Sequence, residues 1–221
     1  GNTKVGGFIG YVEDLKQPTV VSFEDCANHG SVTGSKNYFG GFVGYISDNT
    51  NMTITISNSV NDGNITDSQY YAGGFVGFVG SNTNIVMTIS NSTNNGNVTV
   101  YDYFGGFVGS IYSNTNMIVT ISNCINNGNI TRTGGFFGGL VGGIIKNTNL
   151  ALTISNFTNN ANGIGMSSVG GFVGNIWRST NMTMTISNSI NNGNLTGNQY
   201  YVGGLVGHMN DNGNVTVTIF N

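Results

Sequence analysis

Short stretches along the whole chain alternate between apolar and hydroxylated residues. Residues 52–57 read Met-Thr-Ile-Thr-Ile-Ser, and residues 215–219 read Val-Thr-Val-Thr-Ile. An alternation of period two that is rich in β-branched residues predicts a β-strand with one buried face. Asn, Asp and Gly fill the intervening stretches, and these residues favour turns because they tolerate left-handed backbone conformations. No window has the apolar period of a helix, so the pattern predicts an all-β chain.

The pattern recurs at a fixed interval. A block of two glycines, two apolar residues and a glycine starts near residues 6, 40, 73, 105, 138, 170 and 203, a spacing of about 33 residues. A repeat of this length is typical of solenoids and propellers. Nothing interrupts the register, so we expect one repeat domain over residues 1–221. Residues 1–39 form a divergent first coil, which holds seven of the fifteen charged residues.

A single-domain β-solenoid, or parallel β-helix, fits this repeat better than a propeller, whose blades need about 40 to 45 residues. We expect six to seven coils of about 33 residues with about three strands each. Equivalent residues of successive coils would then stack about 4.8 Å apart. The repeat predicts an inward isoleucine column of Ile56, Ile89, Ile121, Ile154, Ile186 and Ile219. It also predicts a turn ladder of hydrogen-bonded amides at Asn58, Asn91, Asn123, Asn156 and Asn188.

The composition narrows the set of partners. Only 7% of residues are charged and the net charge is −3, which provides no electrostatic footprint for nucleic acid. There is no apolar run near 18 residues, so membrane insertion is not expected. The chain begins Gly-Asn-Thr without an initiator Met, and neither end has a charged cap of the kind that solenoids use for solubility. We therefore expect it to be a segment of a longer solenoid, or a subunit that stacks head to tail on itself.

The sequence predicts no catalytic residue, cofactor or metal site, so the chain is not expected to be an enzyme. The acidic residues Asp48, Asp62, Asp67, Asp102 and Asp211 are assigned to different repeat positions, so stacking is not expected to gather them. Arg132, Lys146 and Arg178 are likewise assigned to unrelated registers. His29 and His208 have no partner that the sequence reveals.

The two cysteines are predicted to be free buried thiols. Cys26 and Cys124 share one column but lie three coils apart, which places them roughly 14 Å from each other. A disulfide needs Cα atoms within about 7 Å.

Three outward columns are candidates for contacts. An aromatic column could serve as a sugar-stacking platform, as a lateral contact or as cross-strand stabilisation. Its members are Tyr38, Tyr71, Tyr103, Phe136 and Tyr201, with Ser168 as the one exception. A valine column that starts at Val43 alternates with Phe42 and should point away from the core, unless a bulge at the next glycine reverses the phase. A threonine column that starts at Thr55 raises an ice-binding hypothesis, although its flanking columns are mixed.

Nine asparagines occur in N-x-S/T triplets and are candidate glycosylation sites if the chain passes through a eukaryotic secretory pathway. They are Asn51, Asn64, Asn91, Asn97, Asn129, Asn156, Asn181, Asn194 and Asn214. A chain so rich in Asn, Ser and Thr contains such triplets by chance, so position is the better argument. Four of them, Asn64, Asn97, Asn129 and Asn194, share one outward column, called here the sequon column.

The alternation of GG-F/L-V-G with I-S-N-S/C-x-x-x-G-N-x-T resembles the GLUG repeat of large secreted and surface proteins of bacteria and protists. The resemblance covers the whole chain, except that the fifth repeat is irregular at residues 160–165. It implies a secreted or cell-surface location and often adhesion, and it implies no catalytic residues. We expect a non-catalytic extracellular structural protein, a stiff rod that contributes to a surface filament or fibre and that carries glycans if the chain passes through a eukaryotic secretory pathway. The alternatives are a carbohydrate-binding adhesin repeat region and an ice-binding protein.

Overall fold

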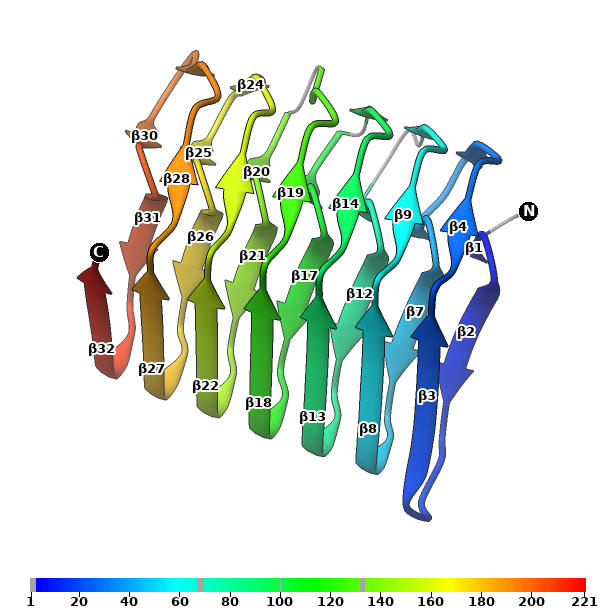
Figure 1. Cartoon of the computed structure of the whole chain (residues 1–221). Coiled ribbons are helices and arrows are strands. Elements are labelled where there is room, and N and C mark those ends of the chain that lie inside the picture. Colours follow the sequence, from blue (N-terminus) through cyan, green and yellow to red (C-terminus); the bar gives the residue numbers. More distant parts are fainter. Residues whose placement is uncertain (1–2, 67–69, 100, 132–133) are drawn as a thin grey trace.

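The chain winds into a parallel β-solenoid of about six turns, which confirms the fold class predicted from the repeats (Figure 1). The computed structural model describes residues 3–66, 70–99, 101–131 and 134–221, and none of them is helical. Each coil stacks on the next with parallel hydrogen bonding and equivalent residues in register, so that Thr88 pairs with Thr55 on one side and Thr120 on the other. The divergent first coil joins the same sheets.

Five columns of strands run along the solenoid axis. The first sheet contains β1 (Lys4–Gly6), β6 (Tyr38–Gly40), β11 (Tyr71–Gly73), β16 (Tyr103–Gly105), β20 (Phe136–Gly138), β25 (Ser168–Gly170) and β30 (Tyr201–Gly203). The second sheet contains β2 (Ile9–Glu13), β7 (Val43–Ser47), β12 (Val76–Gly80), β17 (Val108–Tyr112), β21 (Val141–Ile145), β26 (Val173–Trp177) and β31 (Val206–Asn210). The third sheet contains β3 (Thr19–Glu24), β8 (Thr50–Ser57), β13 (Thr83–Ser90), β18 (Thr115–Ser122), β22 (Thr148–Ser155), β27 (Thr180–Ser187) and β32 (Gly213–Phe220).

The two remaining columns are built of very short strands. The fourth sheet contains β4 (Ala27–Asn28), β9 (Val60–Asn61), β14 (Thr93–Asn94), β19 (Ile125–Asn126), β23 (Thr158–Asn159) and β28 (Ile190–Asn191). The fifth column contains β5 (Val32–Thr33), β10 (Ile65–Thr66), β15 (Val98–Thr99), β24 (Gly163–Gly165) and β29 (Leu195–Gly197), and single bridges through Ile130 join its two parts. A coil thus has up to five strands where the sequence predicts three, because strands of two or three residues are too short to show an alternation.

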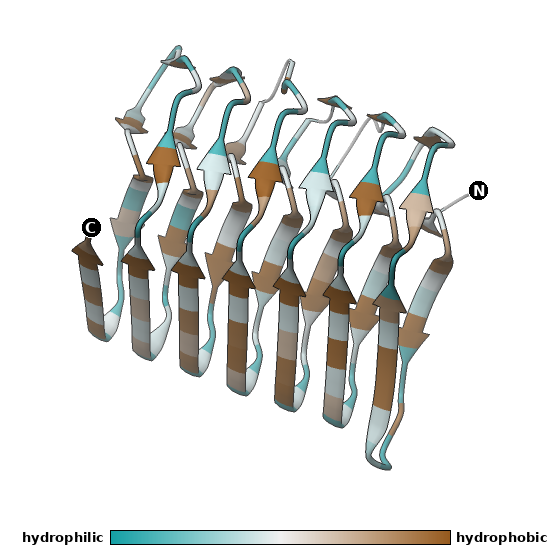
Figure 2. Ribbon diagram, in the orientation of Figure 1, coloured by the Kyte–Doolittle hydropathy of each residue, from teal (hydrophilic) through white to brown (hydrophobic). Residues whose placement is uncertain are grey.

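The apolar side chains form two separate cores. The larger core lies between the second and third sheets and includes the isoleucine column, which is buried from Ile56 to Ile186 and exposed at Ile219. The smaller core lies between the first sheet and the fifth column, around Phe39, Ile65 and Phe104. The connections at the edges of the coils are hydrophilic by contrast (Figure 2).

The valine column faces the larger core, so the prediction of an outward direction is wrong. Val43 is fully buried together with Phe42. The backbone N–H groups of both residues donate to the Phe75 carbonyl oxygen, at 2.9 and 3.0 Å, and this two-against-one pairing is a β-bulge. The bulge reverses the side-chain alternation, and the same pairing recurs at Phe75, Phe107, Leu140 and Phe172 in the following coils.

A waist of glycine and asparagine separates the two cores. A Cβ at Gly41 would collide with the Gly74 carbonyl and with the Asn61 side chain, so only glycine fits where the chain approaches its own amides this closely. The amides form an inner ladder in which each Nδ2 donates to the Oδ1 of the next coil at 2.8–2.9 Å. Its members are Asn28, Asn61, Asn94, Asn126, Asn159 and Asn191.

A second buried ladder, the corner ladder, lies just before the third sheet at Asn49, Asn82, Asn114 and Asn147. The Oδ1 of Asn82 accepts both the backbone N–H and the side-chain amide of Asn49, at 3.0 and 3.1 Å. The amide of Asn82 in turn donates to the backbone carbonyl of Ile46 at 3.3 Å. Neither buried ladder was identified from the sequence.

The turn ladder predicted from the sequence is exposed and only partly hydrogen-bonded. Its residues adopt positive φ angles near 50°, which Asn tolerates better than most residues. Side-chain bonds join Asn91 to Asn58 at 3.3 Å and Asn156 to Asn123 at 2.9 Å. Its asparagines are therefore explained chiefly by turn conformation, whereas the buried ladders carry the axial side-chain hydrogen bonds of the interior.

Truncating one inner-ladder amide should destabilise the solenoid much more than truncating its exposed neighbour. We expect Asn94→Ala to cost about 2–4 kcal/mol, because it leaves buried polar groups of Asn61 and Asn126 without their partner. Asn95→Ala also removes two axial side-chain hydrogen bonds, to Asp62 and from Asn127, but these are exposed. It should therefore change the free energy of unfolding by no more than about 1 kcal/mol, because water replaces the lost partners. Urea denaturation of the two variants checks this, and equal losses of stability would contradict the role given to the inner ladder.

Candidate functional site

The aromatic column runs along the outer face of the first sheet as a stack of half-buried rings. Ring centroids lie 5.4 Å apart between Tyr38 and Tyr71, 5.2 Å between Tyr71 and Tyr103, and 4.6 Å between Tyr103 and Phe136, with interplanar angles below 20°. Such offset stacks stabilise a sheet by roughly 0.5–1.5 kcal/mol for each pair. The column is therefore first of all a structural element.

The neighbouring column of the second sheet has aromatic rings in the first coils and again at its last position, His208, with smaller side chains between them. Tyr45 and Phe78 pack against Tyr38 with centroids 4.6 and 4.9 Å away, so the groove between the two sheets is filled there. The residues that follow in this column are Ser110, Gly143, Asn175 and His208. Small side chains therefore leave space beside the aromatic column toward the C-terminal coils.

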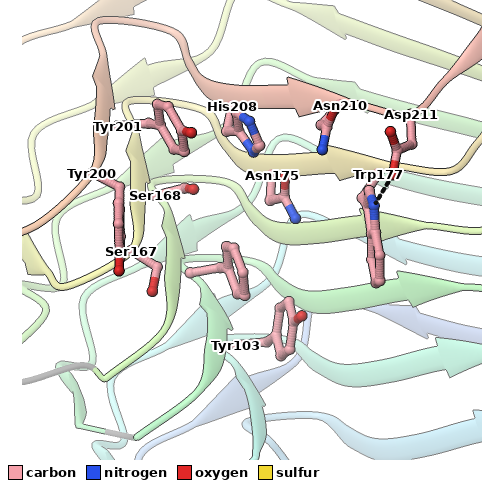
Figure 3. Close-up of a pocket in the computed structure, with 11 residues that line it drawn as sticks. Tyr103, Ser167, Ser168, Asn175, Trp177, Tyr200, Tyr201, His208, Asn210 and Asp211 are labelled. Carbon is pink, nitrogen blue, oxygen red and sulfur yellow. Dashed lines mark hydrogen bonds between the residues drawn. The ribbon is translucent and has the colours of Figure 1, made fainter.

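A cleft opens where small residues coincide in both columns (Figure 3). Ser168 replaces the ring of the aromatic column, and Asn175 lies next to it in the same coil. Phe136 and Tyr103 border the cleft on the preceding coils, and Tyr201 and His208 border it on the following coil. The cleft measures about 420 Å³, which is within the range of about 300–1,000 Å³ typical of small-molecule sites.

The floor of the cleft holds a polar atom without a partner. Asn175 is only 3% exposed, and its Oδ1 has no hydrogen-bond partner among the described residues. The only other such atom in the described part of the chain is Ser110 Oγ, two coils earlier in the same column. A buried acceptor without a donor costs about 1–3 kcal/mol, so it indicates that a donor from outside the chain can be accommodated there.

The far rim of the cleft carries the only tryptophan of the chain. Trp177 Nε1 donates to Asp211 Oδ2 at 3.2 Å, and Arg178 lies over the indole ring, 4.4 Å from its centroid. Arg178 Nε is also 3.6 Å from the same Asp211 oxygen. Opposite this group, Tyr201 and His208 stack with centroids 4.0 Å apart and nearly parallel rings. The cleft thus combines aromatic surface with fixed hydrogen-bonding groups.

These contacts correct several predictions about charged residues. Lys146, Arg178 and Asp211 were assigned to unrelated registers, but all three occupy one column of positive-φ turn residues together with Asp48. Coils of 32 and 33 residues alternate, which obscures this register in the sequence. His29, which had no predicted partner, lies with its Nδ1 2.8 Å from Asp62 Oδ2 at the surface. His208 contacts Tyr201, while Asp67 and Arg132 lie outside the described residues.

Among the described residues, neither the cysteines nor the side chains that could ligate a metal form a reactive cluster. Cys26 and Cys124 are both free, as predicted, although Cys26 is partly exposed and only Cys124 is fully buried. Burial raises the pKa of the Cys124 thiol to about 11, which keeps it protonated at neutral pH. Within the residues that the structure describes, no three His, Cys, Asp or Glu side chains could hold a metal ion together. The same residues include no helix that could span a membrane.

All nine sequon asparagines are exposed at the surface. Three of the sequons line a groove of about 400 Å³, which is lined by Asn64, Asn97 and Asn129 together with Thr66, Thr99 and Thr131. In this sequon column, Oδ1 of Asn64 accepts the backbone N–H of Asn97 at 2.9 Å. That bond does not use Nδ2, the atom to which a glycan would be attached.

The threonine column lies on the outer face of the third sheet, as expected from the alternation. The column beside it is not uniformly hydroxylated, because Val86 and Ile118 are exposed in it. Adjacent large apolar side chains interrupt the flat array of hydroxyl groups on which the ice-binding hypothesis depends.

Comparison with known proteins identifies no relative. No family model, curated protein or solved structure matches the chain. The candidate site therefore depends on its geometry alone.

A carboxyl group near the aromatic column should make the stability depend on pH. Burial raises the pKa of Asp102 to about 6, from an ordinary value near 4. The folded chain therefore binds this proton more tightly than the unfolded chain, so Asp102 destabilises the fold progressively as the pH rises from about 4 to about 6.

Replacing this carboxyl group by an amide should remove that dependence. We expect Asp102→Asn to stabilise the protein by roughly 1 kcal/mol at pH 7 and by almost nothing at pH 4, since partial exposure reduces the full linkage effect. Thermal unfolding across this pH range measures the difference from the unaltered protein. The exposed Asp25→Asn is the control, and an Asp102→Asn effect of the same size at both pH values would contradict the assignment.

Proposed function

We propose that this chain is a non-catalytic structural protein, a stiff β-solenoid rod that contributes to an extracellular surface filament or fibre. The observation that carries the proposal is the continuity of the inner ladder, in which side-chain amides join six successive coils. Parallel strands supply the backbone hydrogen bonds between the same coils. Bending the rod would stretch both sets of bonds on its convex side, which favours stiffness.

The surface supports a role as a rod outside the cell. Only 7% of residues are charged, and polar amides and hydroxyls cover most of the outward positions. Exposed sequons would allow glycans to coat the rod, and in the sequon column a glycan would leave the axial bond of Asn64 in place. The resemblance to GLUG repeats favours the same location. Further coils of the chain, or copies stacked head to tail, would extend the rod.

A carbohydrate-binding adhesin is the second candidate, and the cleft beside Ser168 is the observation that favours it. The two functions are compatible, because a rod can display a binding site on its side. The ice-binding hypothesis has no comparable support, since Val86 and Ile118 interrupt the hydroxylated face.

Electron microscopy of the native protein, combined with intact-mass spectrometry, tests the proposed filament. Seven strands at the usual spacing extend about 30 Å. We expect rods or filaments that are much longer than this, with a mass above that of the bare polypeptide. Short, monodisperse and unmodified particles would contradict the proposal.

A further inference from the structure

We propose that the cleft at Ser168 binds one pyranose ring of a neutral glycan. The proposal concerns a site on the side of the rod, and it does not depend on whether the rod forms filaments. It starts from an interruption in a regular structure: the aromatic column continues through Tyr38, Tyr71, Tyr103 and Phe136, omits one ring at Ser168, and resumes at Tyr201.

The missing ring leaves a space between Phe136 and Tyr201 whose height along the axis suits a pyranose ring. Phe136 and Tyr201 are two coils apart, so about 10 Å separates their positions along the axis. A ring placed between two aromatic side chains needs about 3.5–4 Å on each side for van der Waals contact. A planar aromatic ring would fit loosely, whereas the thicker chair of a pyranose would fill more of the space with its C–H groups against both rings.

The polar groups of the cleft match the hydroxyl groups of a sugar. Asn175 Oδ1 is an acceptor that has no donor among the described residues, and a sugar O–H can donate to it. Asp211 is held by Trp177 and Arg178 at the rim, so it offers an oriented carboxylate as a further acceptor. Both groups accept hydrogen bonds, so the cleft suits a ligand with hydroxyl donors better than a purely apolar ligand.

The charges favour a neutral sugar over an anionic one. The cleft is lined by one carboxylate and by no lysine or arginine. The nearest guanidinium group, that of Arg178, is already paired with Asp211 and the indole ring. An acidic sugar would therefore face an acidic side chain without a free cation to balance it.

The other coils should not bind such a ring, because side chains of the chain itself fill the equivalent space. Tyr71 and Phe78 contact each other with centroids 5.0 Å apart, which fills the equivalent space. In the coil of Phe136, the residue at the position of Asn175 is Gly143. The ring of Tyr103 lies so close to Gly143 that it occupies the space a side chain at this glycine would need. Between Tyr38 and Tyr201, Ser168 marks the only coil that lacks the ring of the aromatic column.

The fluorescence of Trp177 provides a direct readout of binding in the cleft, because Trp177 is the only tryptophan of the chain and borders the cleft. We would screen the full chain against an array of neutral glycans, and then titrate it with cellohexaose, maltohexaose and the hexasaccharide of chitin. We expect a change in tryptophan fluorescence with at least one of these families, and a dissociation constant on the order of 1 mM or below, as for a small site of this size.

Restoring the missing ring should abolish binding without harming the fold. Ser168→Tyr introduces the residue that the column has in other coils, so we expect unchanged circular dichroism and an affinity weakened by at least about thirtyfold, because the added ring occupies the ligand space. Asn175→Ser, which matches Ser110 in the same column, should weaken binding about tenfold through the lost acceptor. Ser22→Tyr, the same replacement on an exposed strand of the first coil, is the control and should bind as the unaltered chain does.

Three results would overturn the proposal. The first is an unaltered chain with no array signal and no fluorescence change up to about ten times the expected dissociation constant. The second is a folded Ser168→Tyr variant that binds as well as the unaltered chain. The third is a response to p-cresol that Ser168→Tyr abolishes, without a response to any sugar, which would assign the cleft to planar aromatic rings instead.

Discussion

The hydrogen bond between side-chain amides of successive coils is the interaction on which this fold depends. An amide carries a donor and an acceptor, so a column of asparagines can bond to itself without limit if its members lie one strand spacing apart. That condition fixes the register of the coils that carry the ladder, since a shift by one residue would turn Asn94 away from the waist and leave the buried amides of Asn61 and Asn126 without their partner. It also demands glycine opposite the amide, because any side chain at Gly74 would collide with Asn94. The division of the interior into two apolar cores follows from this waist.

The same repetition determines where function can be located. Columns of identical residues make a regular surface, and most of the outward aromatic rings are accounted for by their contacts with each other. Specific recognition needs a place that differs from the remaining coils, and the coil of Ser168 and Asn175 is such a place. Ser168 and Asn175 line the same cleft although they are seven positions apart in the sequence. The loss of one ring at Ser168 removes the two stacking contacts that a ring there would make with Phe136 and Tyr201, and the rest of the column keeps its contacts.

The strand pattern was predictable from the sequence, and the polar interior was not. Alternation located the third sheet and the isoleucine column because one face of those strands is apolar. Asn94 and Asn95 are neighbours in the same Asn-rich turn, so no local signal indicates that the first is buried and the second exposed. The bulge at Val43 depends on a carbonyl group of the next coil, and the column of Lys146, Arg178 and Asp211 is obscured by coils of unequal length. Ser168 stands out in the sequence as the one non-aromatic residue of the aromatic column, whereas only the fold shows that Asn175 lines the same cleft.

Hydrogen exchange of the asparagine side-chain amides, measured by NMR on the folded chain, tests the central role of the ladders most directly. We predict that the Nδ2 protons of Asn61, Asn94 and Asn126 exchange as slowly as the backbone amides of the third sheet, because they open only when the coils separate. The amides of Asn95 and Asn127 also donate hydrogen bonds along the axis, to Asp62 and Asn95, but these bonds are exposed. They should exchange much faster than the inner-ladder amides, because they can open to water without separation of the coils. Rapid exchange of all five would show that the inner ladder does not hold the solenoid together.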